Sequence, residues 1–373
     1  MTQIKETLAE LVRIDSVSSR SNAEIIEYLE RRCTAAGLAT RRLPYLDDFG
    51  VEKINLIALS DPNATEVELA LVGHTDTVPY DPNWTEATNL TERDEKLYGR
   101  GACDTKGFIA AALTAVESIE LSKLKKPLSL IFTADEEIGL RGAKKLADAK
   151  PLLARYAIVG EPTSLQPIRA GKGYSLAEVI VKGREAHSAY PSLGASAVFR
   201  AARLINRLES IAVQLKEDRH DAFDPSYTTL NVGLIHGGSA KNVLAGECRF
   251  TLEWRPIPTQ SSQHLLNLFK IAIQEEKSRD PDFHCEVDAN RQDTGFETAA
   301  DSPLIRMLEQ ATGREAGTVA FGTEGAQMMR LGAEAVVIGP GDIREAHRTG
   351  EFVPVGELER CAEVLAHAVR ELC

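Results

Sequence analysis

The stretch VELALVGHTDTVP, at residues 67–79, joins an apolar run to a short polar motif. The run 67–72 predicts a buried strand. Because side chains alternate along a strand, His74 and Asp76 are expected to leave its end on the same side. An imidazole with a nearby carboxylate that orients it is typical of a metal ligand. A turn that contains a hydrogen-bonded histidine fits the same sequence. The rest of the chain decides between these two interpretations.

Strand-like and helix-like segments alternate through the first 160 residues. The pattern predicts strands at 39–43, 55–58, 68–72, 128–133 and 156–160, and helices at 4–13, 22–36, 104–119 and 143–149. Such alternation is typical of an α/β sandwich built on a largely parallel sheet. We therefore predict an α/β catalytic domain with a mostly parallel sheet.

The pattern changes near Gly173 and returns to α/β about 110 residues later. Between these points the sequence predicts strands at 175–182, 228–234, 246–253 and 283–288, and helices at 196–215 and 262–277. The resulting β-α-β-β-α-β order is that of a ferredoxin-like α+β module. Helices at 303–311 and 355–372 and a strand at 336–338 then resume the first pattern. We expect a catalytic domain of residues 1–173 and 289–373, with residues 174–288 inserted.

Size and charge narrow the class of protein. A chain of 373 residues exceeds the size at which one hydrophobic core stops growing, so two domains are expected. The formal charge of -12 disfavours nucleic acid as a partner, since binding would need a basic face. No apolar run reaches the ~20 residues that span a bilayer, and the first residues lack the apolar core of a signal peptide. We expect a cytoplasmic protein with no membrane partner.

The cysteines limit the kind of metal site that the chain can build. Six cysteines are scattered along the sequence without a CxxC pair, which is typical of reduced, mostly buried thiols. A zinc site made of cysteines is therefore not expected. Any metal site must use histidines and carboxylates.

Further metal-type ligands follow other predicted strands or open a helix. They are Asp104, the triplet Asp135, Glu136 and Glu137, then Glu161 and finally His347. Taken alone, Asp104 also fits a helix N-cap, and the acidic triplet also fits a solvated loop. In open α/β sheets, however, ligands bind at the carboxyl ends of the strands. We therefore expect these side chains to meet His74 at one edge of the sheet.

The ligand set suggests two metal ions rather than one. Histidines mixed with carboxylates suit zinc, cobalt or manganese, and the set is too large for one four-coordinate site with an open position. Two ions that share a bridging carboxylate typically stand ~3.5–4 Å apart and make a bound water nucleophilic near neutral pH. One carboxylate must stay off the ions as general base. Glu136, next to a ligand but pointing elsewhere, is the candidate.

Five ordered motifs connect the chain to a known family. GHTDTVP, YGRGACDTKG, TADEEIG, GEPTS and GPGDIREAH resemble the dinuclear zinc metallopeptidase family, which includes acetylornithine deacetylases, succinyl-diaminopimelate desuccinylases, aminoacylases and glutamate carboxypeptidases. The resemblance covers almost the whole chain, including the insert. It implies two divalent ions, zinc first and cobalt as the alternative.

The resemblance also implies roles for the ligands. His74 and Glu161 are expected on different ions that share the bridging Asp104, with Glu137 and His347 completing the set, one on each ion. Asp76 is expected to orient His74, and Glu136 to act as the general base. The peptide after Asp104 is expected to be cis, as is usual in this family.

The insert carries matching signals. The segment GREAHSAYP resembles the family segment whose histidine, here His187, reaches into the active site of the partner subunit of a homodimer and stabilises an oxyanion. Asn242 and Arg255 match family positions that bind the substrate carboxylate, for which a guanidinium fork is well shaped. Lys172 and Thr323 are further candidates for the same pocket.

Two short segments bear on the substrate. GEPTSLQP at 160–167 and GTEG at 322–325 look most like acetylornithine deacetylases. Glu324 either offers a carboxylate to the ornithine ammonium or is an ordinary exposed glutamate. We expect hydrolysis of N²-acetylornithine to ornithine and acetate, a step of arginine biosynthesis. Succinyl-diaminopimelate, acetylcitrulline, a dipeptide, or a catalytically dead binding homologue are the alternatives.

Overall fold

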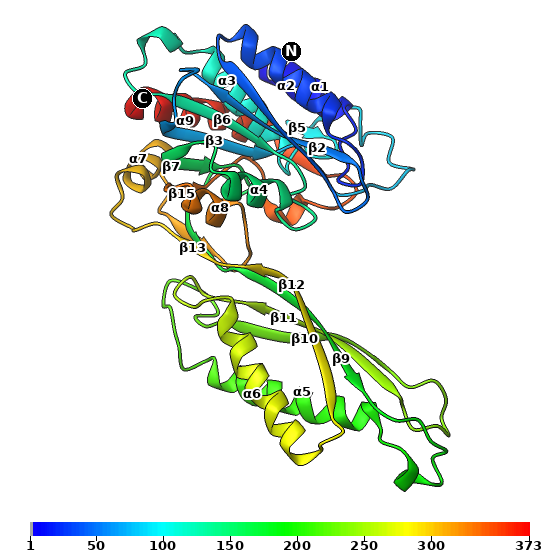
Figure 1. Cartoon of the computed structure of the whole chain (residues 1–373). Helices are drawn as coiled ribbons and strands as arrows, with labels where there is room; N and C mark the ends of the chain where they lie inside the picture. Colours follow the sequence, from blue (N-terminus) through cyan, green and yellow to red (C-terminus); the bar gives the residue numbers. More distant parts are fainter. Residues whose placement is uncertain (1–2) are drawn as a thin grey trace. The chain divides into compact units, whose positions relative to one another are not determined.

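The computed structural model describes residues 3–373 and divides into two compact units (Figure 1). The first unit comprises Met1–Arg169, Glu297–Gly317 and Thr323–Cys373, and the second comprises Ala170–Phe296 and Thr318–Gly322. The insert expected at 174–288 lies within the second unit. That unit also takes in residues 170–173, 289–296 and 318–322. Of these, residues 289–293 belong to β12, which continues beyond the predicted strand end at 288.

A nine-stranded sheet forms the centre of the first unit. Its order is β1-β2-β6-β3-β7-β15-β8-β13, and β14 pairs with β8. The strands are β1 (Ala39–Leu46), β2 (Glu52–Leu59), β3 (Glu66–His74), β6 (Leu128–Thr133), β7 (Leu153–Val159), β8 (Ile168–Gly171), β13 (Phe296–Glu297), β14 (Gly317–Val319) and β15 (Glu334–Val337). The central strands β6, β3, β7 and β15 are parallel, whereas β1 and β2 are antiparallel. The predicted α/β class is thus confirmed.

Helices cover both faces of this sheet (Figure 1). One face carries α1 (Gln3–Arg13), α2 (Ala23–Ala35), α3 (Lys106–Glu117), α7 (Pro303–Thr312) and α9 (Val355–Leu372), and the other carries α4 (Arg141–Ala149) and α8 (Gly325–Arg330). Short 3₁₀ helices are η1 (Leu121–Lys123), η2 (Pro191–Leu193) and η3 (Ile343–Glu345). The larger core lies under the first set of helices.

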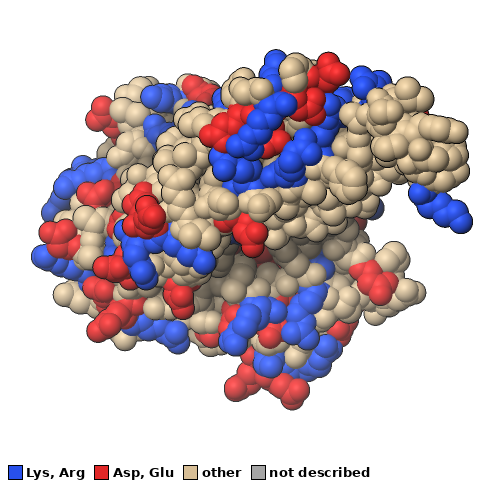
Figure 2. Space-filling view, turned by 90° about the horizontal axis from the view of Figure 1, so that it is seen from below, with Lys and Arg blue, Asp and Glu red and all other residues tan. Residues whose placement is uncertain are grey.

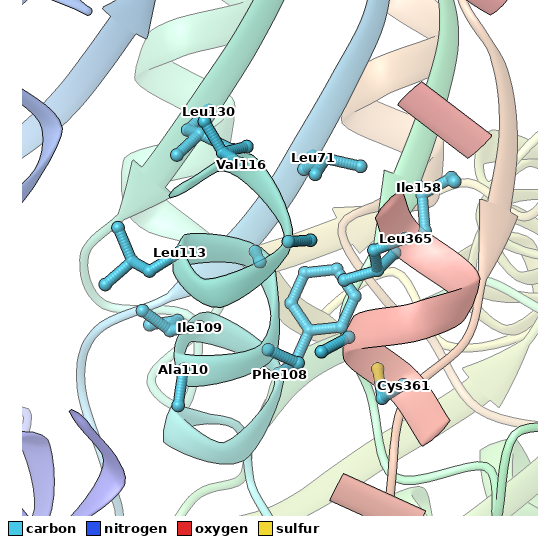
Figure 3. Close-up of a cluster of buried hydrophobic side chains, with 14 of the residues drawn as sticks. Leu71, Phe108, Ile109, Ala110, Leu113, Val116, Leu130, Ile158, Cys361 and Leu365 are labelled. Carbon is cyan, nitrogen blue, oxygen red and sulfur yellow. The ribbon is translucent and has the colours of Figure 1, made fainter. Parts of the chain in front are cut away.

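The core of the first unit fixes α3 against the sheet. Figure 3 shows Phe108 of α3 among Leu71 and Ile158 of the sheet and Cys361 and Leu365 of α9. All five side chains are buried. Burying such side chains stabilises the fold by roughly 1.5–3 kcal/mol each, so α3 is held firmly in place. This matters because Asp104 lies just before α3.

Several short elements of the first unit were not expected from the sequence. A three-stranded sheet joins β4 (Thr91–Arg93), β5 (Lys96–Tyr98) and β16 (Phe352–Pro354), in the order β16-β5-β4. The strands β8, β13 and β14 and the short helix α8 were also missed. Segments of two to six residues are too short to display a helical or strand period, so periodicity cannot find them.

The second unit has the predicted β-α-β-β-α-β order. Its elements are β9 (Tyr174–Lys182), α5 (Ala197–Gln214), β10 (Thr229–Gly237), β11 (Glu247–Arg255), α6 (Gln263–Arg279) and β12 (His284–Asp293). The sheet order is β10-β11-β9-β12, with every neighbouring pair antiparallel. Both helices pack against the sheet and share one core with it. In this strand order, β10 is an edge strand. This is the ferredoxin-like arrangement.

Within residues 3–373, we find no helix that is both long and apolar enough to cross a membrane. The expectation of no membrane partner stays a prediction.

Candidate metal centre

The carboxyl ends of three parallel strands bring the expected ligands together. His74 is the last residue of β3 and pairs in register with Thr133 at the end of β6, while Val72 pairs with Val159 at the end of β7. Glu161 follows β7 after Gly160, where a side-chain Cβ would lie 2.2 Å from the ring of Phe108. Only glycine, which has no Cβ, lets the end of β7 lie this close to α3. Gly160 therefore helps to place the carboxylate of the next residue, Glu161.

Five side chains form two groups of potential metal ligands. One group is His74, Asp104 and Glu161, and the other is Asp104, Glu137 and His347. Within each group the ligand atoms all lie within 4.8 Å of one another. These are the five residues expected to bind metal, and the structure gathers all of them at one edge of the sheet.

Asp104 belongs to both groups and divides its two oxygens between them. Its Oδ1 lies 3.0 Å from His74 Nε2, and its Oδ2 lies 3.1 Å from His347 Nε2. One carboxylate oxygen directed toward each group is the arrangement that a bridging ligand needs. The peptide between Asp104 and Thr105 is cis, as the resemblance implied.

The expected division of ligands between the ions is wrong in one respect. His74 and Glu161 were expected on different ions, yet the structure places both in one group with Asp104. The reason is strand order: β3 and β7 are adjacent and parallel, so residues at their ends are neighbours. Glu137 follows β6 on the other side of β3, and it meets His347, whose Nε2 lies 3.0 Å from its Oε2.

The acidic triplet divides as well. Asp135 is fully buried, forms an ion pair with Lys53 at 2.8 Å and accepts a hydrogen bond from the Tyr45 hydroxyl at 2.9 Å. It therefore does not join Glu137 at the ligand groups. Of the three adjacent carboxylates, one is therefore balanced by a lysine of the same chain.

The remaining carboxylates have no such partner. Within residues 3–373, we find no lysine or arginine paired with Asp104, Glu136, Glu137 or Glu161. Burial raises the pKa of Glu136 and Glu161 well above the usual range, since each carboxylate is removed from water near other carboxylates. A cluster that disfavours its own ionised form in this way fits divalent cations.

The two histidines take up positive charge in this arrangement. Hydrogen bonds to Asp104 and Glu137 raise the pKa of His347 to about 10. Burial acts to lower the pKa of His74, but the hydrogen bond to Asp104 and the negative charges of the neighbouring carboxylates together outweigh it and raise that pKa. For Asp104, burial acts to raise the pKa, while the hydrogen bonds from both histidines lower it. Imidazolium groups here occupy the role that metal cations would take, so the donor set fits two ions.

Asp76 contacts His74 differently from the expectation. Nδ1 of His74 lies 3.0 Å from the main-chain oxygen of Asp76, but 3.8 Å from its nearest carboxylate oxygen. With Nδ1–H donating to this carbonyl, Nε2, which here lies against Asp104, is the nitrogen that would face a metal ion. The carboxylate of Asp76 instead accepts hydrogen bonds from main-chain N–H groups of Glu136 and Glu137.

The candidate residues of the second unit lie on its loops and strand ends. His187 and Asn242 are exposed and near each other, because His187 forms a bridge with Val243 and Ser188 N–H donates to the Asn242 carbonyl at 3.0 Å. Nδ1 of His187 accepts from Ala189 N–H at 3.1 Å, which leaves Nε2 as the donor. An Nε2–H directed to solvent is what an oxyanion donor requires.

Arg255 ends β11, and its guanidinium lies over the ring of Tyr174, 4.5 Å from the centroid. Its Nε donates to Glu253 at 2.8 Å. Stacking and this single bond leave terminal N–H groups available for a carboxylate, which agrees with the expected role.

The other two substrate-binding candidates are occupied locally. Lys172 is buried and donates to the carbonyls of Pro225 and Tyr227, both at 2.6 Å. Burial, followed by the nearby charge of Arg255, lowers its pKa to about 8. The buried Thr323 accepts from Gly325 N–H at 3.2 Å at the start of α8. Lys172 thus holds the segment 225–227, and Thr323 holds the start of α8. Contact with a ligand would be an additional role for either residue.

Glu324 is a residue whose environment the sequence could not show. It is only 1% exposed and accepts a hydrogen bond from the Thr133 hydroxyl at 2.6 Å. Burial raises its pKa to about 7. Thr133 is the residue paired with His74, so Glu324 lies beside the ligand-bearing strand ends rather than on the surface.

Comparison with known proteins agrees with this geometry. The model of peptidase family M20/M25/M40 matches residues 70–371. The chain belongs to this family. The expected enzyme class, a hydrolase of a metallopeptidase family, is thereby confirmed.

Two relatives of this chain are both named acetylornithine deacetylase. An acetylornithine deacetylase of Myxococcus xanthus is 54% identical over 372 residues, which cover 99% of this chain and 97% of the relative. One from Erwinia tasmaniensis is 36% identical and covers 86% and 84%. Among solved structures, a Staphylococcus aureus tripeptidase has a TM-score of 0.77 at 23% identity, with 99% and 98% of the two chains covered.

A further solved structure shares the fold of this M20/M25/M40 chain. A Bacillus subtilis protein described as a dinuclear metal-binding peptidase of the M20 family has a TM-score of 0.71 at 13% identity, with 100% and 98% covered. At such identities, the structural likeness establishes the fold alone.

Proposed function

We propose that this protein hydrolyses the amide bond of an N-acyl amino acid, with N²-acetylornithine as its preferred substrate. Ornithine and acetate are the products. The observation that carries the proposal is the 54% identity to an acetylornithine deacetylase over nearly the whole chain. The two ligand groups that share Asp104 supply the chemistry that such a hydrolysis needs.

Five side chains would hold two divalent ions, with zinc first and cobalt as the alternative. His74, Asp104 and Glu161 would hold one ion, and Asp104, Glu137 and His347 the other. When bound, the ions supply an activated water molecule and polarise the acyl carbonyl. Histidine with carboxylate ligands suits zinc and cobalt alike, so the metal identity is part of the proposal.

Glu136 handles the proton. Its pKa is raised by burial, and its side chain is in neither ligand group. In the reaction it takes a proton from the attacking water and delivers it to the leaving amine nitrogen as the C–N bond breaks. A buried carboxylate with a raised pKa can accept and return a proton near neutral pH.

The second unit supplies the groups that recognise the acyl amino acid. His187 donates from Nε2 to the oxyanion that develops on the acyl oxygen, and Arg255 pairs with the α-carboxylate. Asn242, which lies beside His187, binds the α-carboxylate together with Arg255. Lys172 and Thr323 stay further candidates for contact with the substrate. By its family resemblance, His187 would act in the partner subunit of a homodimer.

Glu324 is proposed to select a substrate with a cationic side chain. Its carboxylate lies at the end of β6 and, among residues 3–373, accepts one hydrogen bond, from the Thr133 hydroxyl. Ornithine carries an ammonium group that acetylcitrulline lacks. An ammonium would favour the ionised form of Glu324 and lower its pKa from about 7.

The test is a substrate panel on protein reconstituted with Zn²⁺ or Co²⁺. We would measure initial rates on N²-acetylornithine, N-succinyl-diaminopimelate, acetylcitrulline and a dipeptide, with Glu136→Gln as the inactive control. Preference for acetylornithine supports the proposal. A higher kcat/KM on another substrate would overturn the substrate and keep the reaction, whereas no turnover of any substrate by protein that holds metal would favour a catalytically dead homologue.

Glu324→Gln sharpens the same panel. The isosteric amide keeps the bond to Thr133 but removes the charge, so kcat/KM for acetylornithine should fall about 10- to 100-fold relative to acetylcitrulline. An equal loss on both substrates would contradict the selective role of Glu324.

The homodimer is also a proposal, and the surface of the second unit supports it. Leu234 and Ile235 on edge strand β10 are 60% and 50% exposed, and Phe199 on α5 is 70% exposed. An unpaired edge strand with apolar side chains favours pairing with a second copy. Light scattering should give twice the mass of one chain. Leu234→Lys should reduce that mass and the activity together, whereas Phe49→Lys, on an exposed loop of the first unit, should change neither.

The remaining expectations stand as proposals as well. Six free thiols suit a reducing compartment, which supports a cytoplasmic location. On the face drawn in Figure 2, acidic and basic side chains are interspersed, and the net charge is -12. Both facts support a small-molecule substrate rather than nucleic acid as the partner.

A further inference from the structure

Two buried carboxylates behind the ligand groups share an unusual bonding pattern. Each accepts hydrogen bonds from two consecutive main-chain N–H groups of a loop that carries a ligand. Asp76 accepts from Glu136 N–H at 3.0 Å and from Glu137 N–H at 3.3 Å. Glu351 accepts from Cys103 N–H at 2.9 Å and from Asp104 N–H at 3.0 Å. The pattern therefore fixes the main chain of both ligand loops.

Each of the two carboxylates also accepts a hydrogen bond from one side chain. The hydroxyl of Ser18, in the loop after α1, donates to Asp76 Oδ2 at 2.7 Å. The guanidinium of Arg100 donates to Glu351 Oε2 at 2.6 Å. Asp76 is 2% exposed and Glu351 is 0% exposed, so these bonds are shielded from water. Hydrogen bonds to an ionised acceptor in such surroundings are the strong ones.

We propose that Asp76 and Glu351 are anchor carboxylates, that is, positioning residues that hold the ligand loops by their main-chain N–H groups. Asp76, helped by Ser18, positions the general base and Glu137. Glu351, helped by Arg100, positions the bridging Asp104. The inference rests on the proposed metal-dependent function, because it assigns these residues their effect through the bound ions.

This assignment differs from an action of Asp76 on His74. The atom of Asp76 nearest to the imidazole is its main-chain oxygen, at 3.0 Å from Nδ1. A change of the side chain leaves that carbonyl in place. The side chain is therefore free to act on the loop of Glu136 and Glu137.

The two anchors predict different losses of metal. Glu137 belongs to one ligand group, so releasing its loop should weaken one ion. Asp104 belongs to both groups, so releasing its loop should weaken both. Loss of a partner that orients a metal ligand typically costs 10–100-fold in affinity.

The experiment is a Co²⁺ titration of metal-free protein, followed by visible absorption, which needs no substrate. Asp76→Asn and Glu351→Leu are the variants. In Asp76→Asn, the amide turns one of the two acceptor oxygens into a donor that faces a main-chain N–H group. At Glu351 a single oxygen, Oε1, accepts both main-chain N–H groups, so a glutamine could keep both bonds, and leucine is used because it removes them. Each is measured in the full chain, in a His347→Ala background that leaves the His74 group, and in a His74→Ala background that leaves the His347 group.

We expect Asp76→Asn to weaken Co²⁺ binding about 10- to 100-fold in the His74→Ala background and less than about threefold in the His347→Ala background. Glu351→Leu should weaken binding in both. In the full chain, the first variant should weaken one binding step and the second variant two. If Asp76→Asn weakened the His74 group instead, or if neither variant changed affinity, the inference would be overturned.

Matched variants separate positioning from folding. Ser18→Ala should weaken the same ion as Asp76→Asn, by less, whereas Ser16→Ala, whose hydroxyl donates to the Thr75 carbonyl, should not. Asp135→Asn breaks the buried pair with Lys53, and should lower the thermal midpoint of the metal-free protein while both binding steps remain. Wild-type protein that binds fewer than two ions would contradict the proposed metal centre, a different result from unchanged variants.

Discussion

The ligand edge of the first unit and the loops of the second unit present their functional side chains in opposite ways. At the edge, His74, Asp104 and Glu161 are buried, and their ligand atoms lie within 4.8 Å of one another. In the second unit, His187 and Asn242 are exposed and contact only their own loop and its neighbour. The fold by itself gathers the potential metal ligands, whereas the proposed recognition groups would need a substrate or a partner chain to act. Substitutions at the edge should therefore abolish the reaction, and those in the second unit should reduce it.

The largest effect is expected from Glu136→Gln. Removing the group that moves the proton should lower kcat by at least about 10²–10⁴-fold, the usual contribution of general acid–base catalysis. Bound metal should stay at the wild-type level, because Glu136 belongs to neither ligand group. Steady-state kinetics and metal analysis of the same preparation measure both quantities.

Asp135→Asn is the matched control for this prediction, since it changes the adjacent carboxylate. Its partner is Lys53, so the variant should lose stability and keep its kcat at temperatures where it remains folded. If Glu136→Gln retained more than about a tenth of wild-type kcat, another base would have to be sought.

His187→Ala should have the next largest effect. Loss of one oxyanion donor typically costs about 10²–10³-fold in kcat, with little change in KM. The fold should be unaffected, because the side chain is exposed and makes one recorded hydrogen bond, to Ala189. Mixing this variant with Arg255→Ala subunits offers a sharper comparison: recovery of activity in mixed dimers would place His187 and Arg255 on different chains of one active site.

Arg255→Lys should act mainly on substrate binding. A lysine keeps the charge but loses the planar fork, so KM should rise about 10- to 100-fold while kcat changes less. Arg291, whose guanidinium also lies over Tyr174, at 4.4 Å from the centroid, is the matched control. Equal effects of Arg255→Lys and Arg291→Lys would mean that the Tyr174 stack, rather than a carboxylate contact, is the important feature.

The sequence predicted the ligand edge well, for a physical reason. An apolar run followed by a polar ligand locates a strand and its end, and ends of parallel strands share an edge whatever the strand order. His74, Asp104, Glu137, Glu161 and His347 follow from that rule and from the motifs. The distribution of ligands between two ions depends on which strands are neighbours in the sheet, and the sequence pattern does not reveal the strand order.

The less successful predictions concern contacts made far along the chain. Asp135 looked like its two acidic neighbours until Lys53, 82 residues earlier, was found beside it. For Glu324, the sequence left a substrate contact and an ordinary exposed glutamate both open, and Glu351 drew no attention although it follows His347 by four positions. A buried carboxylate that accepts main-chain N–H groups has no period and no spacing, so only the folded chain reveals it.

The smallest expected effect concerns the thiols, of which one in the second unit is the most accessible. Cys33, Cys103, Cys361 and Cys373 of the first unit and Cys248 of the second are buried, whereas Cys285 of the second unit is partly exposed. Burial raises the pKa of both Cys33 and Cys285 to about 12, so at pH 8 the thiolate, which is the reactive form, is scarce in either. Accessibility should then decide the order of reaction.

We expect a disulfide reagent to modify Cys285 first, at a rate that rises about tenfold for each pH unit until pH approaches that pKa, and to reach all six thiols only after unfolding. Peptide mapping after brief labelling identifies the first site, and early labelling of Cys103, beside the bridging Asp104, would mean that the ligand edge opens more readily than its burial indicates.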